Sequence, residues 1–110
     1  MEHGATVNVR TKNRWTPLHE ASWYGYLELV RLLLEHGADV EATNDECSTP
    51  LHLAVRSGHL IAAQLLVEQG ANVGVQNMGG LTPLQEATSH GHSEIAKLLL
   101  ERTENGRRGQ

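Results

Sequence analysis

A tetrapeptide recurs at a fixed distance along this chain. Thr-Pro-Leu-His begins at Thr16 and again at Thr49, and Thr-Pro-Leu-Gln begins at Thr82, so successive copies are 33 residues apart. Other residue types keep the same period, namely Ala21, Ala54 and Ala87; Gly25, Gly58 and Gly91; Leu32, Leu65 and Leu98; Leu33, Leu66 and Leu99. A period of this length predicts a stack of similar units, in which each unit covers an apolar face of its neighbour.

The residues of one unit predict two helices. Thr16 can cap free backbone N–H groups, and Pro17 suits the first helical position because its missing N–H leaves no bond unmade. This first helix is expected to run to about Trp23 and to end before Gly25. A second helix is expected over residues 27–35, closed by Gly37 in the left-handed conformation.

The second helix carries a wide apolar face, and the segment after it does not. The residues expected on this face are Leu29, Val30, Leu32, Leu33 and Leu34. Residues 38–47 are polar and rich in turn-forming types, which predicts an extended, hairpin-like connector to the next unit. Each unit is therefore expected to be helix, turn, helix, connector.

The period, the repeated tetrapeptide, the glycine before the second helix and the sequences HGADV and QGANV after it resemble those of ankyrin repeats. The resemblance covers nearly the whole chain. It implies an all-α repeat solenoid in which short inner helices and hairpin fingers line a concave groove. It also implies that the groove binds a protein partner and performs no chemistry.

On this resemblance the chain divides into a remnant of a preceding repeat (1–10), three repeats (11–43, 44–76 and 77–103) and a polar tail (104–110). Residues 3–7 line up with residues 36–40, so the first repeat is expected to lack a neighbour on its N-terminal stack face. Thr103 stands where the second helix should end in glycine, and we expect the array to stop there and the tail to fray.

Two fingers depart from the repeat pattern at their tips. Arg14 and Cys47 occupy the position that Gly80 holds in the third unit. If these two residues take positive φ, each costs on the order of 1 kcal/mol.

Charge and composition exclude several partners. The formal net charge is −4, which disfavours binding to phosphate backbones and anionic membranes. No apolar run approaches the length that spans a membrane. The single cysteine cannot form an internal disulfide, so we expect a reducing compartment, the cytoplasm or the nucleus.

No set of residues predicts catalysis, a cofactor or a metal. Most of the seven histidines, His19, His36, His52 and His59 among them, fall at positions that the resemblance makes structural. The sequence His19-Glu20 begins like a zinc-protease motif, but Trp23 stands where the second histidine is required. Cys47 has no evident base beside it. We therefore expect no enzymatic activity.

All four aromatic residues, Trp15, Trp23, Tyr24 and Tyr26, lie in the first unit. Trp23 and Tyr24 map to the groove, and because Trp and Tyr are enriched at binding hot spots we interpret them as anchors for a partner. Trp15 and Tyr26 are expected to pack mainly against neighbouring units. An alternative is that the rings serve the uncovered N-terminal stack face.

The candidates for partner contact lie on the finger tips and at the ends of the inner helices. They are Lys12, Asn13, Trp15, Trp23, Tyr24, Asp45, Glu46, Ser48, Arg56, Ser57, Met78, Leu81, Ser89 and His90. The expected partner is a protein, and the chain is expected to be a monomer, with self-association through the N-terminal stack face as the alternative. A second hypothesis for function is a tethering segment of a larger regulatory or effector protein.

Overall fold

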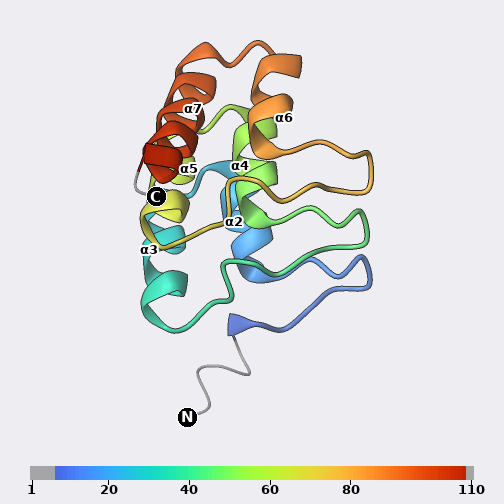
Figure 1. The fold of residues 1–110 in the computed structure, drawn as a ribbon. Helices are drawn as coiled ribbons and strands as arrows, with labels where there is room; N and C mark the ends of the chain where they lie inside the picture. The colour runs from blue at the N-terminus through green and yellow to red at the C-terminus, as the bar shows by residue number, and fades with distance from the viewer. Residues whose placement is uncertain (1–6, 109–110) are drawn as a thin grey trace.

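The computed structural model describes residues 7–108, and the helices of this part form stacked pairs (Figure 1). The inner helices are α2 (Pro17–Tyr24), α4 (Pro50–Ser57) and α6 (Pro83–Ser89). The outer helices are α3 (Leu27–Glu35), α5 (Leu60–Glu68) and α7 (Ser93–Arg108). Between residues 7 and 108 no strand is formed, and the connectors project to one side as fingers. The predicted all-α solenoid is confirmed.

Each inner helix begins with a reciprocal pair of hydrogen bonds. The Thr16 hydroxyl accepts from the His19 N–H at 3.3 Å, and His19 Nδ1 accepts from the Thr16 N–H at 3.0 Å. Thr49 and His52 repeat this arrangement, and in the third repeat Gln85 Oε1 takes the role of the histidine. Two backbone donors at each helix start are satisfied in this way, as in a capping box.

The core lies between the inner and outer helices and between neighbouring pairs. Its largest fully buried apolar side chains are Leu18, Leu51, Leu53, Leu66 and Leu99. The wide apolar face expected on α3 is only partly buried, because Leu29 is 40% exposed and Leu32 is 51% exposed. The residues equivalent to Leu29 are Ala62 and Ile95, which are buried because a preceding repeat covers them.

Backbone hydrogen bonds close the fingers and join them to one another. The N–H groups of Thr11, Asn44 and Asn77 donate to carbonyl groups four residues later at 2.9–3.0 Å. Adjacent fingers are linked because the Asp45 N–H donates to the Asn13 carbonyl at 3.1 Å and the Met78 N–H donates to the Glu46 carbonyl at 2.8 Å. The fingers therefore form a continuous row.

The finger tips adopt the left-handed conformation that the repeat pattern predicts. Arg14 has φ 66°, Cys47 has φ 60° and Gly80 has φ 78°. Arg14 and Cys47 therefore hold a conformation that favours glycine.

The end of the third repeat differs from the expectation. Helix α7 continues to Arg108, where we expected a frayed tail after residue 103. Thr103 replaces the glycine that would end the helix, and its hydroxyl donates to the Leu99 carbonyl at 2.9 Å. Without a left-handed residue at this point the helical hydrogen bonds continue.

Candidate protein-interaction surface

The four aromatic residues form two pairs of rings, which we call the aromatic site. Trp15 and Trp23 meet edge to face, with ring centroids 6.4 Å apart at 76°. Tyr24 and Tyr26 stack, with centroids 5.5 Å apart at 16°. The Trp pair is half-buried, whereas Tyr24 is 56% exposed and Tyr26 is 57% exposed.

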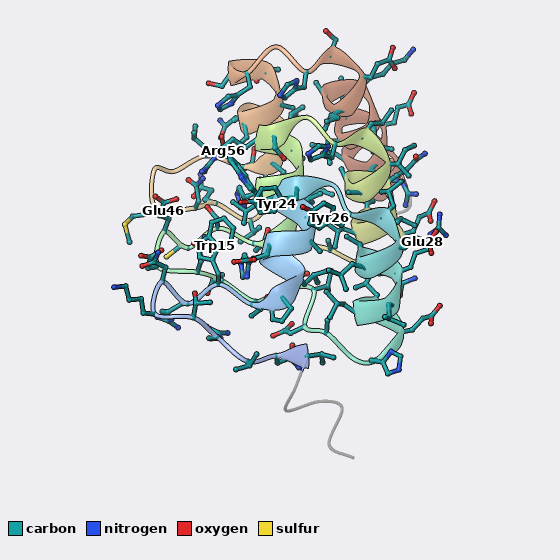
Figure 2. The ribbon with its side chains drawn as sticks, turned by 180° about the vertical axis from the view of Figure 1, so that it is seen from behind. Trp15, Tyr24, Tyr26, Glu28, Glu46 and Arg56 are labelled. Carbon is teal, nitrogen blue, oxygen red and sulfur yellow. The ribbon has the colours of Figure 1, made fainter. Side chains whose placement is uncertain are left out.

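The expectation that Tyr26 packs against a neighbouring unit is wrong. Its ring lies on Tyr24 and is open to solvent, because the described chain places no repeat on that side of α2 and α3. Trp15 packs on Trp23 and also lies 6.0 Å from the His19 ring, centroid to centroid. Figure 2 shows Trp15 towards the fingers, Tyr24 and Tyr26 further towards the outer helices, and Glu28 at the far side.

A cavity of about 260 Å³ opens beside Trp15, between the first finger and α2. Its lining residues are Val9, Arg10, Thr11, Trp15, Thr16, Pro17 and Glu20. Part of the Trp15 ring is therefore accessible from solvent, next to the charged side chains of Arg10 and Glu20.

A groove of about 350 Å³ in the second and third repeats, lined among others by Arg56 and Met78, is built around a buried carboxylate. The Glu86 side chain is 2% exposed, and its Oε2 lies 2.7 Å from Arg56 Nη2 and 2.8 Å from Asn77 Nδ2. A second contact joins Arg56 Nε to Glu86 Oε1 at 3.4 Å. Glu46, on the second finger, lies 3.7 Å from Arg56 Nη1 (Figure 2).

This network stabilises the ionised forms of Arg56 and Glu86. The hydrogen bonds that Arg56 donates to Glu86 raise the pKa of Arg56. Burial alone would raise the pKa of Glu86, but the hydrogen bond and charge of Arg56 outweigh it and the pKa is lowered. Both side chains are therefore ionised at neutral pH, and the guanidinium of Arg56 is held in place.

Arg56 and Glu46 were expected as separate candidates for partner contact, and the structure brings them together. From sequence, the first finger is basic at Arg10, Lys12 and Arg14 and the second is acidic at Asp45 and Glu46, which predicts that the two fingers neutralise each other or orient a partner. Instead Glu46 pairs with Arg56, and Arg10 donates to the Thr43 carbonyl at 3.1 Å. The sequence analysis did not single out Glu86. The signal that could have identified it is a charged residue at a repeat position that Leu53 occupies in the second repeat.

The other candidates differ in accessibility. Those with exposed side chains are Lys12, Asn13, Asp45, Met78, Ser89 and His90. Ser57 and Leu81 are half-buried, and the Ser57 hydroxyl donates to the Leu53 carbonyl at 2.8 Å. The expectation that Ser48 contacts a partner is wrong, since Ser48 is fully buried and its side chain is out of reach of a partner.

The tetrapeptide histidines connect one repeat to the next. Nε2 of His19 lies 2.9 Å from the Ser48 carbonyl, and Nε2 of His52 lies 2.9 Å from the Leu81 carbonyl. Because a carbonyl oxygen only accepts, each Nε2 carries the proton, and the neutral ring accepts at Nδ1. Burial lowers the pKa of both histidines. Their predicted structural role is confirmed.

The described part of the chain forms neither a metal-binding cluster nor a helix that could span a membrane. Among the side chains of residues 7–103, no three His, Cys, Asp or Glu gather in a way that could hold a metal ion. No helix in this stretch combines the length and apolar character needed to cross a membrane.

Comparison with known families agrees with the repeat geometry. A family model described as ankyrin repeats, many copies, matches residues 1–54. A second model, described as ankyrin repeats, three copies, matches residues 41–108. No curated protein matches the chain.

Proposed function

The chain belongs to the ankyrin-repeat family, and from this premise we propose that it binds a protein partner through the aromatic site and the groove beside it. Ankyrin repeats are generally protein–protein interaction modules and are generally non-catalytic. We further propose that this chain has no enzymatic activity of its own and acts in the cytoplasm or the nucleus.

One observation carries the proposal, the concentration of exposed aromatic surface on the first repeat. Trp23 and Tyr24 end helix α2, whereas the equivalent residues are Arg56 and Ser57 in α4. Rings of this size supply large contact area and lose little rotamer freedom on binding, which is why they dominate hot spots. The stacked Tyr pair is more than half exposed although it would gain free energy by burial.

The rest of the groove supplies the features that orient a partner. Arg56 is fixed by two carboxylates and keeps part of its guanidinium exposed, since its side chain is 26% accessible. Met78 is 69% exposed on the third finger and offers an adaptable apolar contact. A partner segment that crosses the fingers would meet rings at one end, charge in the middle and a thioether at the other.

The test is capture of binding proteins from a cell lysate by the wild type and by a variant of the aromatic site. The variant is Trp23→Ser with Tyr24→His, which installs the residues that the third repeat carries at these positions, Ser89 and His90. A protein retained by the wild type is then purified, and its dissociation constant is measured by calorimetry. We expect the variant to bind at least about tenfold more weakly, as is usual when hot-spot rings are removed.

The matched control is Ile61→Glu, on the outer face of α5. Ile61 is 45% exposed, and the equivalent residues of the other repeats are Glu28 and Glu94. The control should bind as the wild type does. Equal affinity of the wild type and the aromatic variant, both with native circular dichroism, would contradict the proposal.

A further inference from the structure

The two end faces of the stack carry complementary halves of the interface that joins neighbouring repeats. We call each part of this interface that an end face presents a half-contact. The first half-contact is a glycine that lies against a ring of the next repeat, and we call this glycine a seat. The His59 ring lies over Gly25, so that a Cβ at Gly25 would be 2.5 Å from His59 Nδ1, and the His92 ring lies over Gly58 in the same way. Gly91 is the third seat, and no described atom lies within 4 Å of its Cβ position. Tyr26 occupies the position of His59 and His92 and is 57% exposed.

A side-chain hydrogen bond is the second half-contact. His19 and His52 each reach a carbonyl of the following repeat, that of Ser48 and that of Leu81. Gln85 stands in their place in the third repeat, and its Oε1 accepts from the Thr82 N–H. Its side-chain NH₂ remains available as a donor, and the carbonyl equivalent to those of Ser48 and Leu81 is that of Trp15.

The row of fingers supplies the third half-contact. Asn13 and Glu46 each accept a backbone hydrogen bond from the next finger. Their equivalent acceptor on the last finger is the carbonyl of Gly79. On the first finger the equivalent donor is the backbone N–H of Lys12.

Apolar surface surrounds these half-contacts at both ends. A cavity of about 660 Å³ lies on the face that we call the C-terminal face, lined among others by Leu84, Gly91, Ala96 and Leu100. Leu100 is 47% exposed, whereas its equivalent Val67 is 7% exposed under the next repeat. The opposite, N-terminal face exposes Tyr26 and Leu29.

We propose that a second copy of this chain stacks on the first, its N-terminal face against the C-terminal face, so that Tyr26 enters the seat at Gly91. A second copy is the expected occupant of the C-terminal face, because the contacts that it would make are the same ones that join the first repeat to the second and the second to the third. The cavity at Gly91 has room for a phenol ring, which is larger than the imidazole of His59. A head-to-tail contact leaves one free face at each end, so it generates open rows of copies and no closed dimer.

Glu20 limits the strength of this contact. It is exposed on the N-terminal face, but its equivalents Leu53 and Glu86 are each 1% exposed. Glu86 is compensated by Arg56 of the preceding repeat, whereas the residue that would face Glu20 from the other copy is Ser89. Burying a carboxylate without a cationic partner is costly, so association is expected to be weak and reversible.

The experiment is sedimentation velocity on the full chain over a wide range of concentration. We expect the wild type to shift from monomer towards dimers and longer rows as concentration rises. Tyr26→Glu blocks only the N-terminal face and Leu100→Glu blocks only the C-terminal face, so each variant alone should stay monomeric. An equal mixture of the two retains one intact pair of faces and should form a one-to-one dimer and nothing larger.

A variant that should associate more strongly guards against a misreading, because loss of association in the blocking variants could also result from unfolding. Glu20→Leu installs the residue that the second repeat carries there, and it should raise the association constant about tenfold or more because it removes the buried charge. Ile61→Glu, on the outer face, should associate as the wild type does.

Three results would overturn the proposal. They are a monomeric wild type and Glu20→Leu variant at every concentration, a dimer of Leu100→Glu alone, which indicates contact between two N-terminal faces, and no dimer in the mixture. Tyr26 takes part in both proposals, but partner binding is tested at Trp23 and Tyr24, whereas stacking is also tested at Glu20 and Leu100. Failure of one proposal is therefore distinguishable from failure of the other.

Discussion

At the scale of single residues, the finger tips show how a repeat pattern predicts backbone conformation. Arg14, Cys47 and Gly80 share one register, and all three have positive φ. The sequence predicts this because Gly80 indicates a positive φ at this repeat position, and the equivalent residues Arg14 and Cys47 are expected to adopt the same conformation. Side-chain chemistry at this position then adds strain without changing the fold.

Replacing Cys47 by glycine is expected to stabilise the protein. Relief of left-handed strain exceeds the extra entropy that glycine gives the unfolded chain, so the free energy of unfolding should rise by about 0.5 kcal/mol. Urea unfolding followed by circular dichroism measures the change.

The matched reverse substitution is Gly80→Ala, at a tip where a Cβ would meet no described atom within 4 Å. Only conformational strain can act there, so the free energy of unfolding should fall by a similar amount. Cys47→Ala keeps the strain and should give no gain. Destabilisation by Cys47→Gly would contradict the strain argument.

The pairing of Arg56 with Glu86 could not be read from the sequence. The two residues lie 30 positions apart in different repeats, and the motif marks neither of them. Only stacking places the end of α4 beside the middle of α6, where the carboxylate is buried.

Breaking this pair should be more costly than removing it entirely. Arg56→Met leaves the buried Glu86 uncompensated and is expected to lower the free energy of unfolding by about 3 kcal/mol. Adding Glu86→Leu, the residue of the second repeat at this position, should restore most of that loss. Denaturant unfolding of the two single variants and the double variant gives the coupling, and strictly additive losses would contradict it.

At the scale of helices, the sequence predicts starts better than ends. Thr and Pro fix the first turns of α2, α4 and α6 through local hydrogen bonds. The end of α7 is harder to predict. Thr103 stands where glycine would end the helix, and the absence of glycine allows the helix to continue but does not force it to do so. The exposure of Leu29 depends on whether a repeat covers α3 and not on α3 itself, and it agrees with the expectation that the first repeat lacks a neighbour on its N-terminal stack face.

The helix-start histidines predict how stability depends on pH. Burial lowers the pKa of His19 and His52 below the ordinary value of about 6.5, so on acidification the unfolded chain takes up protons before the folded one. The free energy of unfolding should therefore decrease as pH falls through about 6.5, until the folded-state pKa is passed.

Replacing His19 and His52 by glutamine should reduce this dependence. Gln85 shows that glutamine completes the same cap in the third repeat without a titrating ring. Urea unfolding between about pH 7.5 and pH 5.5 compares the slopes of the wild type and the double variant around the histidine pKa. An unchanged slope in the double variant would contradict the assignment.

At the scale of the whole molecule, the sequence locates the aromatic residues but not their arrangement. All four rings fall within one repeat, which composition alone reveals. Their division into a half-buried Trp pair and an exposed Tyr pair depends on the turn at Gly25, where φ is 73° and the chain reverses between α2 and α3. Exposure of the Tyr pair also reflects the uncovered N-terminal face of the described stack.

Both tryptophans of the chain belong to the aromatic site, so a probe of tryptophan reports on this site alone. The most direct measurement is fluorine NMR of the chain labelled with 5-fluorotryptophan, titrated with a protein that the wild type retains from lysate. We predict that the resonances of Trp15 and Trp23 shift or broaden and saturate at one partner per chain. Binding detected by calorimetry with both resonances unchanged would contradict a partner site built on these rings.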